Sequence, residues 1–283
     1  MSEQSEFDAY LSLSDVTEDD HRWAFGTGFA DPLAGLGEAV PPDVDPAALA
    51  DRCLALGDDA LIYSHRLQQW VTRGPELEEE TALANIALDL LGQARLLLAR
   101  AAQAEGSVPG KGGRDEDRLA FFREEREFRN VRLVERADAD FAELTARLLV
   151  FSAWRLAVFE GLTADPDPVL AAIAAKAVKE LTYHRDYAAA WVIRLGDGTD
   201  YSHAKMQAAL DALWPYAGEL DLDATTAAYL GGVFAEATLT GPSASPLAPV
   251  SGKTGRDGTH TEAMGYILAE LQSVARANPD ATW

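Results

Sequence analysis

The chain has 283 residues, of which 48% are hydrophobic, and it carries a formal net charge of -22. That hydrophobic content is enough for a sizeable core in one large domain or two modest ones, which excludes disorder of the whole chain. The acidic balance repels phosphate backbones and anionic headgroups, so neither nucleic acid nor a membrane surface is an expected partner. The single cysteine, Cys53, excludes an intramolecular disulfide framework and a site with several thiolate ligands.

Residues 1–46 form an acidic segment, which contains eleven Asp and Glu residues and a single basic residue, Arg22. The segment also contains Trp23, Phe25 and Phe29. It is predicted to be an irregular N-terminal arm, either a disordered tail or an arm that lays its aromatic rings on the body or on a partner. The acidic start lacks the basic and apolar parts of a signal peptide, so a soluble protein in a reducing cytoplasm is expected.

Residues 47–283 are predicted to form a single helical domain, because Ala, Leu, Glu, Arg and Gln dominate and nothing is typical of a strand. Long helices are expected over roughly 46–72, 76–103 and 139–163, and from an Asp165–Pro166 cap to about residue 196. Helices of this length favour an all-α, ferritin-like four-helix bundle. Additional C-terminal helices are expected over about 200–218, 223–238 and 259–277, the last beginning with a Thr259 and Glu262 capping box.

Two of the long helices carry an apolar stripe that we expect to be buried. On the second helix the stripe consists of Leu77, Ala84, Leu88, Leu91, Ala94 and Leu98. On the third helix it consists of Phe141, Leu144, Leu148, Phe151, Val158 and Leu162, with Arg155 among them. Between these helices, a shorter helix is predicted over the sequence RLAFFREEREFRN. The charged run around it is either a salt-bridged, solvated face or, slightly favoured, a subunit interface.

A ferritin-like bundle raises the possibility of a di-iron centre, which takes two Glu-x-x-His pairs because residues three apart share one helix face. The residues three positions before the five histidines His21, His65, His184, His203 and His260 are Glu18, Ile62, Leu181, Asp200 and Asp257. Only His21 fits the pattern, and it lies in the acidic arm rather than on a long helix. The sequence therefore does not predict a di-iron centre in this chain.

Several polar residues nevertheless fall at helical spacing inside apolar helices. Glu180 and His184 are four apart on the fourth helix, while Asn85, Asp89 and Gln93 follow one another at a spacing of four on the second. The simplest interpretation is a buried, hydrogen-bonded polar seam in which Arg155 neutralises Asp89 or Glu180. The alternative is a single metal ion bound by Asp89, Glu180 and His184.

Long stretches of the chain resemble the C subunits of the bacterial ring-1,2-phenylacetyl-CoA epoxidase. They are WVTRGPELEEETALANIALDLLGQARLLL, RLAFFREEREFRNVRLVE, AAIAAKAVKELTYHRDYAAAWVIRLGDGTD, ALWPYAGEL, GKTGRDGTHTEAMGYILAELQ and the terminal Trp283. The resemblance begins at about residue 48 and leaves only the acidic arm outside it. It implies a ferritin-like fold and a catalytic A subunit as partner, which carries the di-iron centre and the CoA ester, with a reductase supplying electrons.

Against the pattern of that catalytic relative, this chain has Leu90 and Gln93 where the second helix should have Glu and His. On the fourth helix it has Leu181 and His184. The resemblance therefore implies a structural subunit with vestigial ligand positions, no catalytic residues and no cofactor of its own. The open alternatives are the degenerate single-metal site, with a part in oxygen chemistry, and a self-associating helical scaffold without an oxygenase partner.

Overall fold

The structure is a computed structural model that describes residues 39–108, 113–242 and 245–281, all within one compact unit. In chain order its helices are α2 (Pro46–Gln68), α3 (Leu77–Gly106), α4 (Glu116–Phe121), α5 (Phe141–Leu162), α6 (Pro168–Gly196), α7 (Asp200–Ala217), α8 (Ala224–Glu236) and α9 (Glu262–Ala277). Short 3-10 turns η1 (Glu125–Glu127), η2 (Arg132–Glu135) and η3 (Gly255–Asp257) lie between them. Because the described part contains no strand, the all-α, ferritin-like prediction is confirmed.

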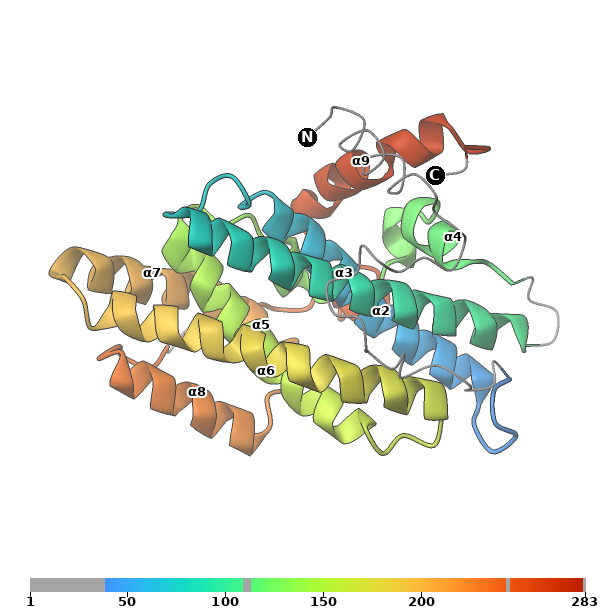
Figure 1. Ribbon diagram of the computed structural model, residues 1–283, viewed down its shortest axis with the longest axis horizontal. Coiled ribbons are helices and arrows are strands. Elements are labelled where there is room, and N and C mark those ends of the chain that lie inside the picture. The colour runs from blue at the N-terminus through green and yellow to red at the C-terminus, as the bar shows by residue number, and fades with distance from the viewer. Residues whose placement is uncertain (1–38, 109–112, 243–244, 282–283) are drawn as a thin grey trace, which may run out of the picture. The chain divides into compact units, whose positions relative to one another are not determined.

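The four long helices form the bundle. α2 packs along α3, α5 packs along α6, and α3 joins the two pairs by packing against α6 (Figure 1). α7 and α8 pack on α5 and α6, while α9 lies against α4 and α2. The bundle therefore places the middle of α3, α5 and α6 around a common interior.

α5 is the most buried of the long helices. The predicted stripe on it is confirmed at Leu144, Leu148 and Phe151, which have no exposed surface, and Arg155 among them is equally buried. Phe141, Val158 and Leu162 at the ends of the stripe are only half-buried. An arginine is thus placed inside an apolar core, where its charge needs partners.

The stripe predicted on the second helix is wrong for three of its leucines. Leu77, Leu88 and Leu91 are 73%, 56% and 44% exposed. The buried face of α3 is instead formed by Leu83, Ile86, Leu90, Ala94, Leu97 and Leu98. α3 has apolar side chains on two faces, and periodicity alone does not say which of the two turns inward.

The starts of two helices differ from the prediction. α6 is capped by Asp167 with Pro168 at its first turn, one Asp-Pro pair later than expected. Asp165–Pro166 and Asp167–Pro168 both have the residue types of a helix start, an Asp cap followed by proline. Asp167 also forms a buried ion pair with Arg100 of α3, and this tertiary contact favours the second pair as the start of α6. α9 begins after Thr261 rather than at Thr259, because the Thr261 backbone nitrogen and hydroxyl both donate to Glu135.

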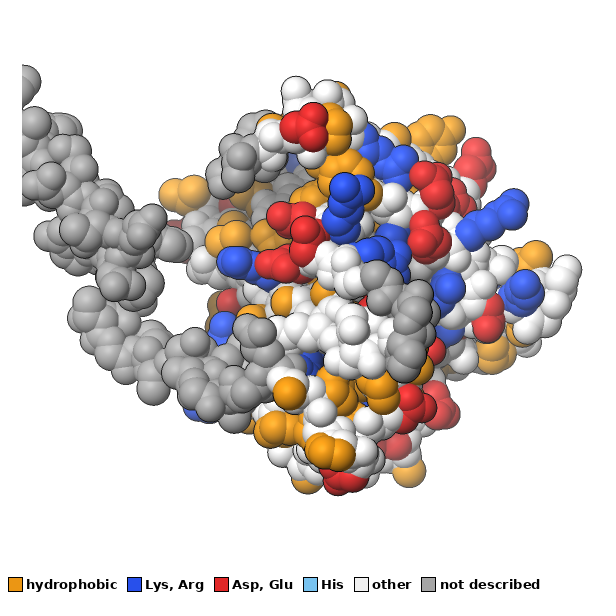
Figure 2. Space-filling view, turned by 90° about the vertical axis from the view of Figure 1, so that its right-hand side faces the viewer, with side chains coloured by type: hydrophobic (Ala, Val, Ile, Leu, Met, Phe, Trp, Pro, Cys, Tyr) orange, Lys and Arg blue, Asp and Glu red, His pale blue; other side chains and the backbone are white. Residues whose placement is uncertain are grey.

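The helix predicted over RLAFFREEREFRN ends at Phe121, so the prediction is wrong beyond that residue. Beyond it the chain turns inward: the Arg123 guanidinium pairs with Asp58 of α2, and the Arg129 backbone nitrogen donates to the same carboxylate at 2.8 Å. The backbone N–H group of Arg129 thus finds its acceptor in the Asp58 carboxylate instead of in a helix. Part of the run thus binds its own chain, while its residues 124–127 are exposed. Acidic and basic side chains are interspersed over the face of the molecule shown in Figure 2.

Among the described helices, α3 alone is long and apolar enough to span a membrane by length and composition. α3 packs against α2 and α6, as a core helix does. The boundary drawn between a 1–46 arm and a 47–283 domain stays a prediction, since residues 1–38 lie outside the described residues. So do the arm's aromatic residues and His21.

Candidate functional site

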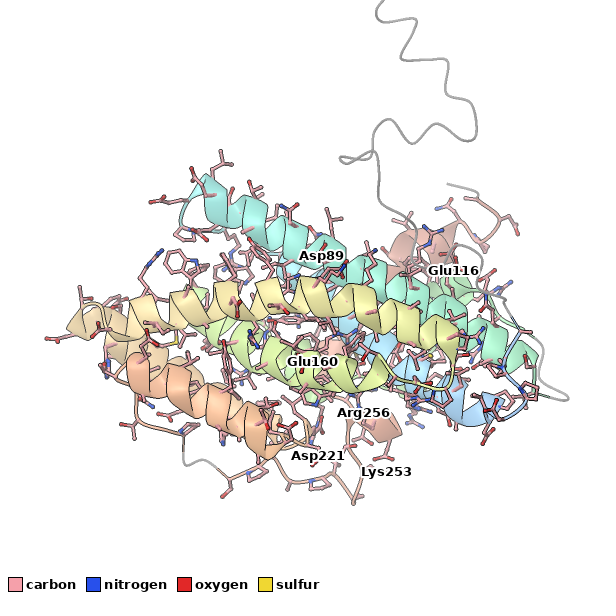
Figure 3. The ribbon with its side chains drawn as sticks, turned by 60° about the horizontal axis from the view of Figure 1, so that its bottom comes forward. Asp89, Glu116, Glu160, Asp221, Lys253 and Arg256 are labelled. Atoms are coloured by element: carbon pink, nitrogen blue, oxygen red, sulfur yellow. The ribbon has the colours of Figure 1, made fainter. Side chains whose placement is uncertain are left out.

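Five polar residues lie between α3, α5 and α6, from the buried interior to the surface, and we call them the polar cluster: Asp89, Gln93, Arg155, Glu180 and His184. Asp89 with Gln93 on α3, and Glu180 with His184 on α6, are each four residues apart, which puts each pair on one helix face. Figure 3 shows Asp89 midway along α3, beside α6. Asn85, which the sequence pattern placed in the same polar seam, is exposed.

Gln93 is the link between the helices. Its side-chain nitrogen donates to Glu180 Oε2 at 3.0 Å, and its oxygen accepts a hydrogen bond from Arg155 Nε at 3.0 Å. A neutral amide can serve both neighbours because it has a donor end and an acceptor end. Arg155 therefore reaches Glu180 through Gln93, and no direct hydrogen bond joins Arg155 to Asp89 or Glu180 among the described contacts.

Arg155 is completely buried. Its Nη1 donates to the Leu56 carbonyl oxygen at 3.1 Å, and its guanidinium lies 4.4 Å from the centre of the Phe159 ring. Burial lowers the pKa of Arg155 to about 10, although the nearby carboxylates of Asp59 and Glu180 act in the opposite direction. At neutral pH the side chain is a fixed positive charge at the centre of the bundle.

The two carboxylates of the polar cluster differ in environment. Burial raises the pKa of Glu180, and the charge of Asp89 adds to the effect, while the hydrogen bond from Gln93 opposes it. The Asp89 side chain is 37% exposed, and its Oδ2 lies 2.9 Å from Nε2 of the fully buried His184. His184 Nδ1 has no hydrogen-bond partner within the described structure.

The polar cluster does not fit a di-iron centre. Leu90 and Leu181 are fully buried apolar residues at two of the expected ligand positions. A third position, Gln93, directs an N–H donor at the Glu180 carboxylate, and a guanidinium lies behind it. Iron needs oxygen and nitrogen lone pairs, whereas these three positions present two apolar side chains and an N–H donor.

The residues of the single-metal alternative belong to two different hydrogen bonds. Asp89 is bonded to His184, whereas Glu180 is bonded to Gln93. In the described ranges, no group of three or more His, Cys, Asp and Glu side chains could hold a metal ion. The single-metal alternative therefore stays a prediction.

Sequence reasoning missed a second buried charged network, around Asp58 and Asp59 of α2. Both carboxylates have no exposed surface. Asp58 pairs with Arg123, and Asp59 accepts from Arg256 at 2.8 Å and from the Val131 backbone nitrogen at 2.8 Å. The sequence feature that could have indicated this network is the pair of adjacent acids, Asp58 and Asp59, inside a long and largely apolar helix.

The same network contains a buried Glu135–His260 pair. Glu135 Oε1 lies 2.7 Å from His260 Nδ1, and His260 Nε2 lies 3.1 Å from the Phe128 carbonyl oxygen. A carbonyl oxygen can only accept, so Nε2 must donate. Glu135 also accepts from Asn130 and from Thr261, the residue before α9. The Glu135–His260 contact therefore ties η2 to the segment that leads into α9.

Comparison with known proteins supplies the family. A family model described as phenylacetic acid catabolic protein matches residues 36–228 and 221–283. The C subunit of 1,2-phenylacetyl-CoA epoxidase from Escherichia coli (strain K12) is 44% identical over 250 residues, covering 81% of this chain and 97% of the relative. The chain therefore belongs to the phenylacetic acid catabolic protein family, and within it to the C subunits of the 1,2-phenylacetyl-CoA epoxidase.

Proposed function

We propose that this chain is a non-catalytic structural subunit of a multicomponent di-iron phenylacetyl-CoA 1,2-epoxidase, acting in the aerobic degradation of phenylacetate in the cytoplasm. Its partner is the catalytic A subunit, which carries the di-iron centre and the substrate, and a reductase completes the complex. The family membership supports a place in the epoxidase. The non-catalytic, structural role goes further than the family membership and is the part that we propose.

The observation that carries the structural role is the hydrogen-bond chain from Arg155 through Gln93 to Glu180. The chain occupies the place where a catalytic relative would hold its metal ligands, and it needs no ion to balance the charge of Glu180. Arg155 and Gln93 also tie α5 to α3, and Glu180 ties α3 to α6. The polar cluster is therefore suited to fixing the helices of a scaffold.

The proposal predicts that the complex keeps its activity when the titratable groups of the polar cluster are neutralised. Glu180→Gln and His184→Gln should be made in this chain and assembled with the wild-type A subunit and reductase. Epoxide formation should stay within about twofold of wild type, because loss of a group that transfers protons in the reaction costs roughly 100-fold or more.

Two results would contradict the proposal. A loss of turnover of that size in folded, fully assembled Glu180→Gln complex would assign the polar cluster a part in the oxygen chemistry. Failure of the wild-type chain to co-purify with the co-expressed A subunit would remove the partnership itself.

A further inference from the structure

One face of α3 carries a row of apolar side chains that the bundle does not cover. We call Leu77, Ala84, Leu88 and Leu91 the leucine seam. Their spacings of seven, four and three residues repeat the pattern of a heptad, which is the spacing of side chains that pack against another helix. Leu77, Leu88 and Leu91 are 73%, 56% and 44% exposed, so no described element of this chain fills that role.

The leucine seam differs from ordinary exposed hydrophobic residues, which are scattered singly over most surfaces. The other exposed large hydrophobic side chains are spread over separate elements: Tyr183 on α6, Tyr201 on α7, Tyr266 and Val274 on α9, and Val250 in a loop. α3 is also the described helix whose composition would suit a membrane span, although only 44% of that window is buried. Part of the apolar surface of α3 therefore lies on its outer face, at Leu77, Leu88 and Leu91.

The charges beside the leucine seam indicate the kind of partner. Glu76 and Glu78 are exposed next to Leu77 and form no ion pair with other described residues. Arg95, one heptad beyond Leu88, makes a single long contact with Glu116 at 3.8 Å. A second copy of this chain would bring another formal charge of -22 against this face, which disfavours self-pairing.

We propose that the leucine seam is the docking site for an amphipathic helix of the catalytic partner subunit, with its apolar stripe against Leu88 and Leu91 and a basic end against Glu76 and Glu78. The inference rests on the proposed function, since it names the surface through which that partner binds. Coiled-coil spacing favours a helix over a loop or strand as the occupant. The unpaired carboxylates of Glu76 and Glu78 determine which end of the partner helix lies beside Leu77.

The test is a binding measurement with a Leu88→Glu and Leu91→Glu double variant, co-purified and titrated against the A subunit. Because both leucines are already exposed, the variant should fold with an unchanged helical circular dichroism spectrum. Its affinity for the A subunit should fall by about 100-fold or more, as expected when the centre of an interface receives two unpaired charges. Tyr201→Glu is the matched control, since Tyr201 is 74% exposed on α7, and it should bind like wild type.

A second variant tests the charge argument. Glu76→Lys with Glu78→Lys should slow association with the A subunit and reduce its dependence on salt, because fewer attractive pairs remain to be screened. Wild-type binding by both double variants would overturn the docking site while leaving the complex intact. If the wild-type chain forms a dimer that Leu88→Glu and Leu91→Glu dissociate, a second copy is the occupant and the inference is wrong. Absence of any complex with wild-type chain would instead count against the proposed function.

Discussion

Gln93 and Glu180, which lie on different helices and 87 positions apart in the chain, are joined by a 3.0 Å hydrogen bond in which the amide donates to the carboxylate. The amide oxygen of Gln93 is held by Arg155, so the direction of this hydrogen bond is fixed. A carboxylate at position 93 would lose the donor, and a histidine would lose the acceptor when protonated. Glutamine is therefore suited to this position in a way that a metal ligand is not.

Arg155→Met should destabilise the protein strongly. The change removes a buried cation that donates to the Gln93 oxygen and to the Leu56 carbonyl. The Gln93 oxygen then has no donor, while the Leu56 carbonyl keeps its place in α2. The expected loss is about 2–4 kcal/mol in the free energy of unfolding, measured by urea denaturation. Arg95→Met is the control: the Arg95 side chain is 77% exposed and should change stability by less than about 0.5 kcal/mol. Equal effects of the two variants would contradict this account of Arg155.

Glu180→Gln should make stability less dependent on pH. Burial raises the pKa of Glu180 in the folded state above its ordinary value of 4.5. The folded state therefore holds the proton more tightly, so this group's stabilising contribution is full below the unfolded pKa and is lost as pH rises through the folded pKa. The glutamine variant keeps an acceptor for Gln93 but has no such loss. Its stability relative to wild type should rise between pH 4 and pH 7, and a difference that stays constant or falls would contradict the prediction.

His260→Ala should loosen the attachment of α9. Removing the imidazole takes the Nδ1 contact away from the fully buried Glu135, and it removes one of the two donors of the Phe128 carbonyl, the other being Arg129 Nη1. We expect a loss of about 1–3 kcal/mol in the free energy of unfolding and faster amide hydrogen exchange in residues 262–277. His65→Ala provides the comparison, because the partner of His65 is Glu270, whose side chain is 63% exposed. Unchanged exchange in α9 of His260→Ala would show that the Glu135–His260 contact does not hold the helix in place.

Gly255→Ala and Gly231→Ala should have opposite effects. A Cβ at residue 255 would lie 2.2 Å from the Asn130 carbonyl oxygen, whereas one at residue 231 in α8 would meet nothing within 4 Å. The first change should cost about 1–3 kcal/mol through the clash with backbone, and the second should stabilise α8 by about 0.5–1 kcal/mol. Thermal unfolding of the two variants gives the comparison, and a shift of both melting temperatures in the same direction would be inconsistent with the packing at Gly255.

Much of the bundle could be predicted because composition, caps and breakers mark long helices in a sequence. The Gly74–Pro75 break and the Gly196–Asp197–Gly198 turn lie close to where α2 and α6 end. The choice of face on α3 could not be predicted, because Leu83 and Leu88 are alike as sequence and differ only in what packs against them. When a helix has apolar side chains on two faces, the elements that pack against it determine which face is buried.

Helical spacing pointed to the residues of the polar cluster, together with Asn85, which is exposed, but it did not reveal their connections. Helical spacing placed Asp89, Gln93, Glu180 and His184 on inward faces, but it did not show that Gln93 stands between Arg155 and Glu180. The network around Asp58 was missed because its partners, Arg123 and Arg256, come from irregular segments whose course depends on tertiary contacts. Ion pairs between residues distant in the chain leave no local periodic signal.

The most direct test of the structural role is the iron content of each chain in the assembled complex. The co-expressed complex, produced in iron-replete cells, should be measured by native mass spectrometry as the intact assembly and after release of its individual subunits, alongside this chain purified alone. We expect the iron to remain with the A subunit, and this chain to have the mass of its polypeptide in both preparations. Near-stoichiometric iron or manganese retained by this chain, and lost in Glu180→Gln or His184→Gln, would contradict the account.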